Sequence, residues 1–289
     1  MKLPPLPSRE ILTDLAKEVG TRERVSPSAV EKDFYLTRTI WALAERFGEK
    51  LLLKGGTLLS KVDLGYYRMS EDADLVMPLE GSGRYKSANA KAMNVVRDAL
   101  RVLAPDIGLS FPHPDGERSD RHREVIWTLP YPSAFGGQAI AIEVSLRPVH
   151  RPARRASLRQ LLEDPLIGDY AGAYCWAMDA TEARAEKVRA AFTREAARDY
   201  FDLALLAKAG VDLTSENFLA LVDAKLAELK HPSLRSAAAV FGLTPERRRR
   251  LEASVRKDLP AVLRIGEPHF DLDAMLTRFA NLWRLEPCT

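Results

Sequence analysis

Two short motifs, at residues 54–57 and 68–74, constrain the fold of this chain more than any other feature. The first consists of Lys54, Gly55, Gly56 and Thr57. The apolar run 51–53 before it predicts a buried strand, and the glycine pair predicts a turn in which the backbone can approach a ligand closely. Thr57 is expected to be the N-cap of a short helix that ends at Gly65.

The second motif carries two carboxylates, Asp72 and Asp74, at the start of an apolar segment. Side chains alternate across a strand, so both carboxylates are expected on one face. Two carboxylates that close repel each other, and one of them would tend to take up a proton. A magnesium ion removes this conflict, because it prefers oxygen ligands and substrate phosphates.

Together the two motifs predict nucleotidyl transfer. Free N–H groups at the start of a helix attract phosphate, and two metal ions roughly 3.5–4 Å apart can hold the attacking and leaving oxygens of an in-line displacement. Each motif alone has a simpler interpretation, since a glycine turn is usually only a turn and an Asp-x-Asp pair is usually a solvated strand end. The order of strand, turn, helix and second strand favours the catalytic interpretation.

A third carboxylate is expected on a neighbouring strand, and Glu143 is the candidate. In the strand predicted at residues 139–146, apolar residues alternate with Ala141, Glu143 and Ser145. Small neighbours suit a crowded site, and a carboxylate there could bind the second metal ion and lower the pKa of an attacking hydroxyl. The alternative is an ordinary exposed strand residue.

The motifs resemble those of the AbiEii/AbiGii nucleotidyltransferase toxins, which belong to the DNA polymerase β-like nucleotidyltransferase superfamily. Residues 54–57 and the spacing Arg-x-Ser-x-Asp-x-Asp at residues 68–74 carry the resemblance. Residues 30–36 resemble the helix before the core, residues 186–190 the family's lysine motif, and residues 198–203 its Arg-Asp-x-x-Asp motif. Threonine in place of serine after the glycines, and a slightly longer gap, depart mildly from the superfamily pattern.

The resemblance spans about residues 31–206 and implies an α+β fold. A polymerase β-like nucleotidyltransferase core with a small mixed sheet and N-terminal helices is expected in residues 1–160, and a helical domain in residues 161–289. The expected nucleotide-binding residues are Lys54, Gly55, Gly56, Thr57 and Ser70. The expected ligands of two magnesium ions, with manganese as the alternative, are Asp72, Asp74 and Glu143.

Lys187 and Asp199 are assigned by the resemblance. Spacing alone favours a surface lysine that pairs with Glu182, Glu186 or another neighbour. The family motifs instead imply that Lys187 reaches the cleft and balances triphosphate charge, and that Asp199 positions this lysine or contacts the nucleotide. Asp202, three residues later on the same face of the predicted helix, is expected to be structural.

The resemblance further implies the toxin of a type IV toxin–antitoxin pair, which transfers NMP from an NTP to tRNA 3′ ends and releases pyrophosphate. A cognate antitoxin is the implied protein partner, and Ser70 resembles an acceptor of modification by a kinase-like antitoxin. Two alternatives stay open. One is transfer to a protein or a small molecule, as in antibiotic-modifying relatives, and the other is a non-catalytic nucleotide-binding protein of the same fold.

Clustered arginines favour an RNA substrate, because such clusters can neutralise phosphates. The net charge itself is only +3. The clusters are Arg151, Arg154, Arg155 and Arg159; Arg118, Arg121 and Arg123; and Arg247, Arg248, Arg249, Arg250, Arg256 and Lys257. For residues 247–250 a solvated helix face is preferred, with Glu246 and Glu252 as pairing partners.

Composition excludes several classes of protein. With 46% hydrophobic residues the chain can bury a substantial core, and no apolar run approaches the ~20 residues of a membrane helix. The N-terminal residues lack an apolar signal core, and Cys175 and Cys288 form no disulfide framework. A cytoplasmic location is expected, and the resemblance adds that it is bacterial.

Helices and strands are expected in two blocks. Strands are predicted at residues 51–53, 72–77, 125–129 and 139–146, with helices at 8–19, 26–47 and 85–103. The proline- and arginine-rich segment 147–156 predicts a loop or hinge. Helices are then predicted at residues 181–209, 215–229, 232–241, 245–262 and 272–285. This order predicts a mixed α/β core followed by a helical half.

Overall fold

The computed structural model describes residues 3–79, 86–119, 123–234, 244–267 and 270–283. The chain divides into two compact units, Met1–Asp179 and Ala180–Thr289. The first unit is α+β and the second is helical, which confirms the predicted fold class. Among the described residues, no helix is both long enough and apolar enough to cross a membrane.

The first unit begins with two helices whose ends follow from local side-chain chemistry. In α1 (Arg9–Glu23), the hydroxyl of Ser8 accepts a hydrogen bond from the N–H of Ile11. In α2 (Pro27–Phe47), Ser26 is the N-cap, a proline occupies the first turn, and Gly48 is the C-cap with a positive φ of 57°. Serine caps and first-turn prolines favour helix starts, and glycine accepts the backbone conformation at helix ends.

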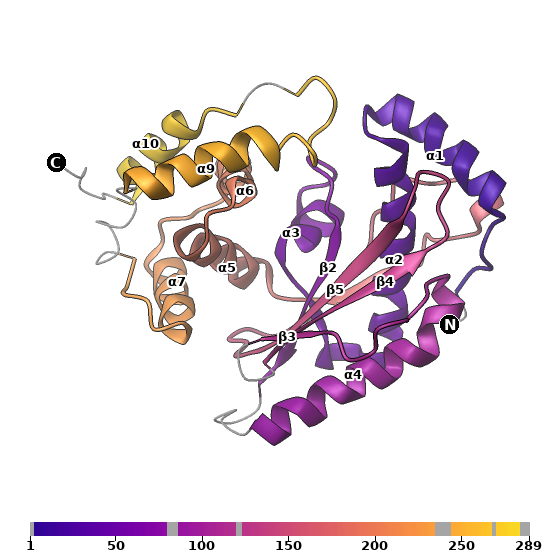
Figure 1. Ribbon diagram of the computed structural model, residues 1–289. Coiled ribbons are helices and arrows are strands. Elements are labelled where there is room, and N and C mark those ends of the chain that lie inside the picture. The colour runs from indigo at the N-terminus through magenta and orange to yellow at the C-terminus, as the bar shows by residue number, and fades with distance from the viewer. Residues whose placement is uncertain (1–2, 80–85, 120–122, 235–243, 268–269, 284–289) are drawn as a thin grey trace. The chain divides into compact units, whose positions relative to one another are not determined.

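A seven-stranded mixed sheet forms the centre of this unit (Figure 1), with the order β3-β4-β5-β2-β1-β7-β6. Its strands are β1 (Leu52–Leu53), β2 (Asp72–Pro78), β3 (Glu117–Ser119), β4 (Glu124–Tyr131), β5 (Gln138–Arg147), β6 (Arg154–Ser157) and β7 (Tyr174–Ala177). β2 runs parallel to β5 and antiparallel to β1, whereas β4 runs antiparallel to β5. The central strands therefore come from segments far apart in the sequence.

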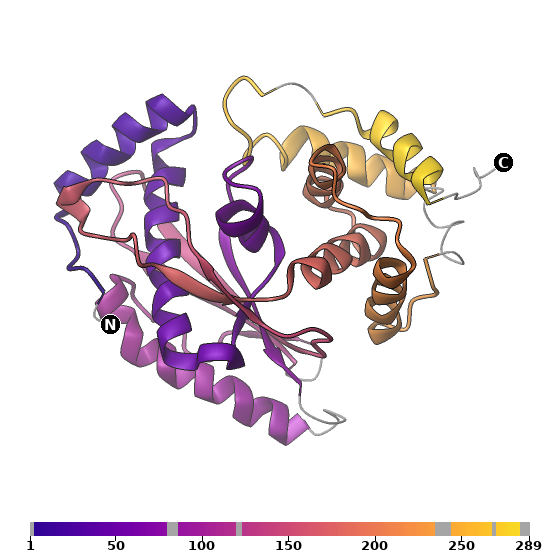
Figure 2. The ribbon, with the colours of Figure 1, turned by 180° about the vertical axis from the view of Figure 1, so that it is seen from behind.

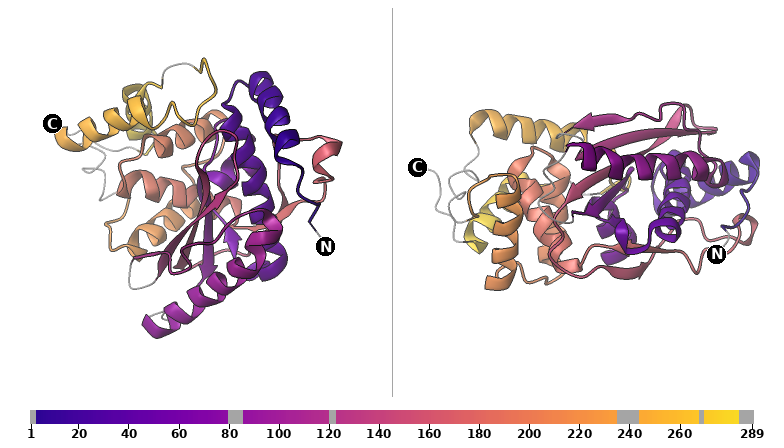
Figure 3. Two further views of the ribbon diagram at one scale, coloured as in Figure 1. Left: turned by 45° about the vertical axis from the view of Figure 1, so that its right-hand side comes forward. Right: turned by 90° about the horizontal axis from the view of Figure 1, so that it is seen from below.

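Helices pack on the sheet and on one another within this unit. α2 contacts β2, β5 and β7 and so covers one face of the sheet, as Figure 2 shows. α1 and α4 (Lys86–Ile107) both pack against α2, and Figure 3 shows them from two further sides. The short helix α3 (Gly55–Leu58) continues into a π-helical turn, η2 (Leu59–Asp63), and packs against β2. Short 3-10 turns, η1 (Gly48–Lys50) and η4 (Pro165–Ile167), complete the unit.

Part of the segment 147–156 is a strand and not only a loop, which corrects the sequence-based expectation. β6 pairs antiparallel with β7, and β7 pairs parallel with β1. Neither short strand shows a period that sequence reasoning detects, because pairing with distant residues makes them strands. The hydrogen bonds of β7 also place the division of the chain after Asp179, whereas the sequence placed a domain boundary at residue 160.

The second unit consists of α5 (Ala180–Thr193), α6 (Ala197–Lys208), α7 (Glu216–Glu228), α9 (Pro245–Lys257) and α10 (Leu272–Leu282). α5 packs against α6 and α7, and α6 packs against α9 and α10. The single helix predicted at residues 181–209 is two helices, α5 and α6. The helix predicted at residues 232–241 lies mostly outside the described residues.

Candidate active site

The glycine turn joins β1 to α3. The N-cap of α3 is Lys54, and Thr57 lies inside the helix, so the expectation that Thr57 caps it is wrong. Gly55 has a φ of +68°, a conformation that L side chains rarely adopt, and this lets the helix begin directly after the strand. The N–H of Lys54 donates to the carbonyl of Asp74 over 2.9 Å, which fixes the turn against the second motif.

Both glycines are needed because charged side chains fill the space beside them. A Cβ atom at Gly55 would lie 2.2 Å from Oδ2 and 2.9 Å from Cβ of Asp74. A Cβ atom at Gly56 would lie 2.1 Å from a terminal nitrogen of Arg68. Arg68 is 3% exposed and donates to the carbonyl of Met69 over 2.9 Å. The glycine pair therefore admits one carboxylate and one guanidinium group close to the turn.

Thr57 links the two motifs through its hydroxyl group. This fully buried hydroxyl donates to the carbonyl of Asp72 over 2.5 Å and accepts from the hydroxyl of Ser70 over 2.6 Å. Since a hydroxyl has one proton to donate, Thr57 cannot donate to a ligand in this arrangement. The hydroxyl of Thr57 instead holds the start of β2 against α3. Ser70, which bonds to this hydroxyl, is half-buried.

The three predicted acidic residues occupy one face of two adjacent strands. Asp72 and Asp74 alternate with buried Ala73 on β2. In the parallel register of β2 and β5, Asp74 lies opposite Glu143, and Asp72 lies opposite Ala141. Paired residues of adjacent strands point to the same face of a sheet. Glu143 therefore lies on the side of the sheet that carries both aspartates.

Lys54 supplies positive charge to this face. Its Nζ lies 3.3 Å from Oε1 of Glu143, and both side chains are partly exposed, at 18% and 30%. The pair joins the residue before the glycine turn to the strand next to the aspartates. An ion pair that remains accessible to water contributes little stability, so its ammonium group is available for exchange with other partners.

Asp72 and Asp74 fit a magnesium site by the chemistry of their donor atoms. Magnesium prefers carboxylate oxygens and binds through one or two carboxylates together with substrate phosphates. Gly55 leaves the space in which the carboxylate of Asp74 lies. Within the described part of the chain, no three acidic, histidine or cysteine side chains form a complete metal-binding group. The cation next to Glu143 is the ammonium group of Lys54.

The lysine and Arg-Asp-x-x-Asp motifs of the second unit form one buried cluster. Lys187 lies 3.0 Å from Asp199 and 2.8 Å from Asp202, and all three side chains are at most 3% exposed. Arg194 adds two hydrogen bonds to Asp199, of 2.5 and 2.8 Å. Burial by itself would raise the pKa of Asp199, but Lys187 and Arg194 outweigh it and hold this pKa below its ordinary value. Asp199 is therefore an ionised anchor for Lys187.

The alternative partners of Lys187, Glu182 and Glu186, are bound elsewhere. Lys225, itself fully buried, lies 2.7 Å from Glu182 and 3.5 Å from Glu186. The interpretation of Lys187 as a surface lysine that pairs with these two glutamates is thus wrong. Lys187 and Asp199 do lie together, as the family motifs imply, and Asp202 contributes to the same cluster.

Comparison with known proteins agrees with this arrangement of motifs. Residues 41–278 match the family "Nucleotidyl transferase AbiEii toxin, Type IV TA system". This chain belongs to the AbiEii family. It is accordingly a nucleotidyltransferase of the toxin type found in type IV toxin–antitoxin systems, and the resemblance inferred from the sequence motifs is confirmed. A search of curated proteins gave no significant match.

Solved structures share the fold of this AbiEii protein. MenT4, a nucleotidyltransferase toxin from Mycobacterium tuberculosis H37Rv, is 18% identical with a TM-score of 0.59, covering 96% of this chain and 89% of its own. JHP933 from Helicobacter pylori is 16% identical with a TM-score of 0.53, covering 90% and 92%. A putative nucleotidyltransferase from H. pylori is 19% identical with a TM-score of 0.50, covering 90% and 95%. At these identities the likeness establishes a shared fold.

Most of the clustered arginines of this AbiEii protein bind its own groups. Arg250 pairs with Glu195 and Glu246, Arg248 pairs with Glu252 and Asp273, and Arg247 donates to the carbonyls of Ala191 and Phe192. The solvated, paired helix face expected for residues 247–250 is thus confirmed for Arg248 and Arg250, whereas Arg247 is half-buried against α5. Arg154 binds Asp63 at 2.5 Å, whereas Arg155 and Arg159 are exposed. Arg121 lies outside the described residues.

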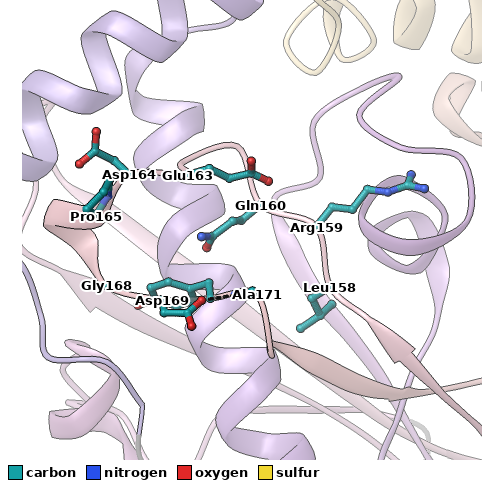
Figure 4. Close-up of a pocket in the computed structure, with 10 residues that line it drawn as sticks. Leu158, Arg159, Gln160, Glu163, Asp164, Pro165, Gly168, Asp169 and Ala171 are labelled. Atoms are coloured by element: carbon teal, nitrogen blue, oxygen red, sulfur yellow. Dashed lines mark hydrogen bonds between the residues drawn. The ribbon is translucent and has the colours of Figure 1, made fainter.

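A pocket of about 710 Å³ lies elsewhere in the first unit, along the loop 158–171 (Figure 4). None of its lining residues belongs to the two motifs. Figure 4 shows Arg159 extended away from Asp164 and Asp169. Each of these aspartates accepts a backbone N–H two residues later, over 2.8 Å. Their carboxylates stabilise turns of the loop, so this pocket is not assigned to the reaction.

Sequence reasoning missed two charged residues next to the motifs. Arg68 was noted only as part of the motif spacing, and its burial beside Gly56 gave no signal in the sequence. Arg194 lies in the break between α5 and α6, a break that the sequence did not predict. In both cases the charged side chain lies next to a residue that only the folded structure brings close to it.

Proposed function

We propose that this AbiEii protein is a magnesium-dependent enzyme that transfers NMP from an NTP to the 3′ end of a tRNA. The observation that carries the proposal is the position of Asp74. Its carboxylate lies against the glycine turn and opposite Glu143 in the register of β2 and β5. A carboxylate pair beside a glycine turn is what a triphosphate with its cation requires.

Each residue of this face has a separate proposed role. Asp72 and Asp74 would hold magnesium, with manganese as the alternative ion, and Glu143 would join them as the third ligand. When bound, these ions neutralise phosphate charge and favour ionisation of the attacking hydroxyl. The backbone of Gly55 and Gly56 lets the triphosphate approach closely.

Lys54 lies within reach of the same face, through its 3.3 Å contact with Glu143, and would contribute positive charge to the phosphates. In the proposed step the 3′-hydroxyl oxygen forms a bond to the α-phosphorus and the proton of the hydroxyl passes to water. The bond from the α-phosphorus to the bridging oxygen breaks, and pyrophosphate leaves with its electron pair.

Lys187 and Asp199 are proposed to balance triphosphate charge from the second unit. The support is their direct ion pair and the family motifs in which they stand. A compact ammonium group held by two buried carboxylates is fixed in position but largely neutralised. The effect of Lys187 on a nucleotide would therefore depend on the net charge of the whole cluster around it. Arg194 adds a further positive charge to that cluster.

The acceptor is proposed to be tRNA, with exposed Arg155 and Arg159 among the groups that contact its backbone. Arg155 lies over the ring of Tyr174, 3.9 Å from the centroid, so its guanidinium is held in place while still exposed. Phosphate contacts of this kind make binding depend on salt. A tRNA acceptor places the reaction in the cytoplasm, and a cognate antitoxin is the expected protein partner.

The test is incubation of the purified protein with each α-labelled NTP, magnesium and total tRNA. We expect label on RNA, and we expect Asp72→Asn and Asp74→Asn each to lower the rate at least about 100-fold, since loss of a metal ligand removes several kcal/mol of transition-state stabilisation. Asp14→Asn, at an exposed position on α1, is the matched control and should retain the wild-type rate.

Three other outcomes separate the alternatives. Label on a protein or a small molecule, with none on RNA, would replace tRNA as the acceptor. Metal-dependent binding of NTP without any transfer would identify a non-catalytic binding protein. Absence of both binding and transfer, in protein shown to be folded, would overturn the proposed function.

A further inference from the structure

The buried side chains of Asp33 and Lys61 form a cluster with the half-buried side chain of Tyr66, here called the Asp33 cluster. Asp33 comes from α2, Lys61 from the π-helical turn η2, and Tyr66 from the loop after it. Nζ of Lys61 donates to Oδ1 of Asp33 and, over 2.9 Å, to the hydroxyl of Tyr66. Asp33 and Lys61 are 2% and 1% exposed.

The cluster also captures a second stretch of backbone. The hydroxyl of Tyr66 lies 2.7 Å from the carbonyl oxygen of Arg159, and the N–H of Leu161 donates to Oδ2 of Asp33 over 3.0 Å. The N–H of Arg159 donates to the carbonyl of Lys61 over 2.9 Å. α2, η2, the loop after η2 and the segment 159–161 therefore meet at this one group of side chains.

This position matters because it lies in the chain between the two motifs. Residues 58–71 connect the glycine turn to Asp72. The hydroxyl of Thr57 holds the end of that connection, and Asp63 within it pairs with Arg154. Lys61 and Tyr66 hold its middle. Lys61 lies in a π-helical turn. Such turns are rare in proteins, and those that occur often lie at functional sites.

Stability alone does not account for the cluster. Burial lowers the pKa of Lys61, and the carboxylate of Asp33 opposes that shift. A buried ion pair is often no more stabilising than apolar residues of similar size, and its best-supported use is to specify one arrangement. The arrangement specified here is the path of the loop that leads into Asp72 and Asp74.

We propose that Asp33, Lys61 and Tyr66 are positioning residues for the carboxylates of Asp72 and Asp74. They touch neither substrate nor the reacting atoms. By fixing residues 61–66 against α2, they set where the chain enters β2. This inference rests on the proposed transferase activity for its catalytic consequence, and on hydrogen bonds of the described residues for its structural one.

A matched control exists on the same helix. Arg38 on α2 is 1% exposed and donates to the hydroxyl of Tyr170 over 2.5 Å, as well as to the carbonyls of Pro4 and Asp106. Tyr170→Phe removes a hydroxyl that contacts a buried cation of α2, just as Tyr66→Phe removes a hydroxyl that contacts Asp33. These three partners of Arg38 lie outside residues 58–74.

The first measurement is hydrogen–deuterium exchange of residues 67–74 in the two variants, at a temperature where both are folded. Tyr66→Phe removes the hydrogen bonds of this hydroxyl, so the exchange of residues 67–74 should become about tenfold faster. Tyr170→Phe should leave the exchange of these residues at the wild-type rate. Equal exchange in the two variants would overturn the inference, whether or not the protein transfers nucleotides.

The second measurement is steady-state transfer. Misplacement of catalytic groups lowers turnover more than ground-state binding, so Tyr66→Phe should lower kcat about tenfold and change KM for the NTP less than about threefold. Asp33→Asn, which keeps the shape but removes the charge, should act in the same direction. An unchanged kcat in both variants, with an active wild type, would overturn the inference. An inactive wild type would count against the proposed function, and the exchange result would still decide the positioning role.

Discussion

The carboxylate of Asp74 fills the space that a side chain at Gly55 would need, since a Cβ atom there would lie 2.2 Å from Oδ2 and 2.9 Å from Cβ of Asp74. Because Cβ of Asp74 is attached directly to the backbone of β2, it cannot move aside without moving the strand. Gly56 differs, since the nearest atom to its virtual Cβ is the far end of Arg68. The two glycines therefore have unequal tolerance to substitution.

We predict that Gly55→Ala destabilises the protein more than Gly136→Ala does. Both positions have positive φ, of 68° and 98°, so both substitutions carry a backbone cost of about 1–3 kcal/mol. Nothing lies within 4 Å of a Cβ atom at Gly136, whereas at Gly55 the clash adds about 1–3 kcal/mol. Urea denaturation of the two variants gives the difference in the free energy of unfolding. Equal losses of unfolding free energy in the two variants would show that Asp74 can move aside at little cost.

The hydroxyl of Thr57 is predicted to matter for stability even without a nucleotide. Thr57→Val keeps the shape of the side chain but removes the hydroxyl that donates to the partly buried carbonyl of Asp72, which costs about 1–3 kcal/mol of unfolding free energy. Thr57→Ser keeps the hydroxyl and loses one buried methyl group, a cost of about 1 kcal/mol. Chemical denaturation in nucleotide-free buffer should give Thr57→Val a lower free energy of unfolding than Thr57→Ser. The reverse order would remove the structural role of this hydroxyl.

The ends of α2 could be predicted from the sequence because they depend on neighbours in the chain. Ser26 with Pro27 begins the helix and Gly48 ends it, as local chemistry requires. The placement of Asp72 and Asp74 on one face of a strand follows from the same local rules. These features need no knowledge of distant residues.

The features that sequence reasoning missed depend on partners far away in the chain. The α3 helix begins at Gly55 and not after Thr57, and the hydroxyl of Thr57 bonds to Asp72 instead of capping a helix. β6 and β7 are strands because they extend the sheet from β1. The family motifs brought Lys187 and Asp199 together in the sequence analysis, but only the structure shows that Arg194 completes their cluster.

Removal of the charge of Lys187 is predicted to be costly at neutral pH. Lys187→Met leaves Asp199 and Asp202 buried without their shared cation, which should lower the free energy of unfolding by about 3–5 kcal/mol. Arg194→Gln should cost less, because the side chain of Arg194 is 50% exposed. Thermal and urea denaturation at pH 7 should rank the two variants in this order.

Acid should reduce the difference between the wild type and Lys187→Met. The pKa of Asp199 is lowered in the folded wild type, so its ionised form contributes stability above the ordinary aspartate pKa, and this contribution is lost as pH falls through the folded pKa. In Lys187→Met, protonation of a carboxylate instead relieves repulsion as pH falls. The stability difference should therefore shrink as the pH falls below the ordinary aspartate pKa of 3.8 and towards the folded pKa of Asp199. A stability difference between the two proteins that is constant over this pH range would contradict the pairing of ionised Asp199 with Lys187.

Glu31 is predicted to make the first unit less stable as pH rises. Its carboxylate is fully buried on α2 and accepts a hydrogen bond from Ser133, in the connection between β4 and β5. Burial raises its pKa above the ordinary 4.5, and the bond from Ser133 only partly opposes that shift. The folded protein thus retains a proton at a pH where the unfolded chain has lost it. This contribution to stability is complete below pH 4.5 and is lost as pH rises through the folded pKa.

Glu31→Gln tests this sign directly, because glutamine has nearly the same shape and does not titrate. The stability of the wild type minus that of the variant should decrease as pH rises from 4.5 and become constant above the folded pKa of Glu31. Glu18→Gln, at an exposed position on α1, should show no such trend. Urea denaturation of the three proteins at half-unit steps between about pH 4 and pH 8 gives the curves. A difference that grows with pH would mean that the folded protein stabilises the ionised form of Glu31 and that the raised pKa is wrong.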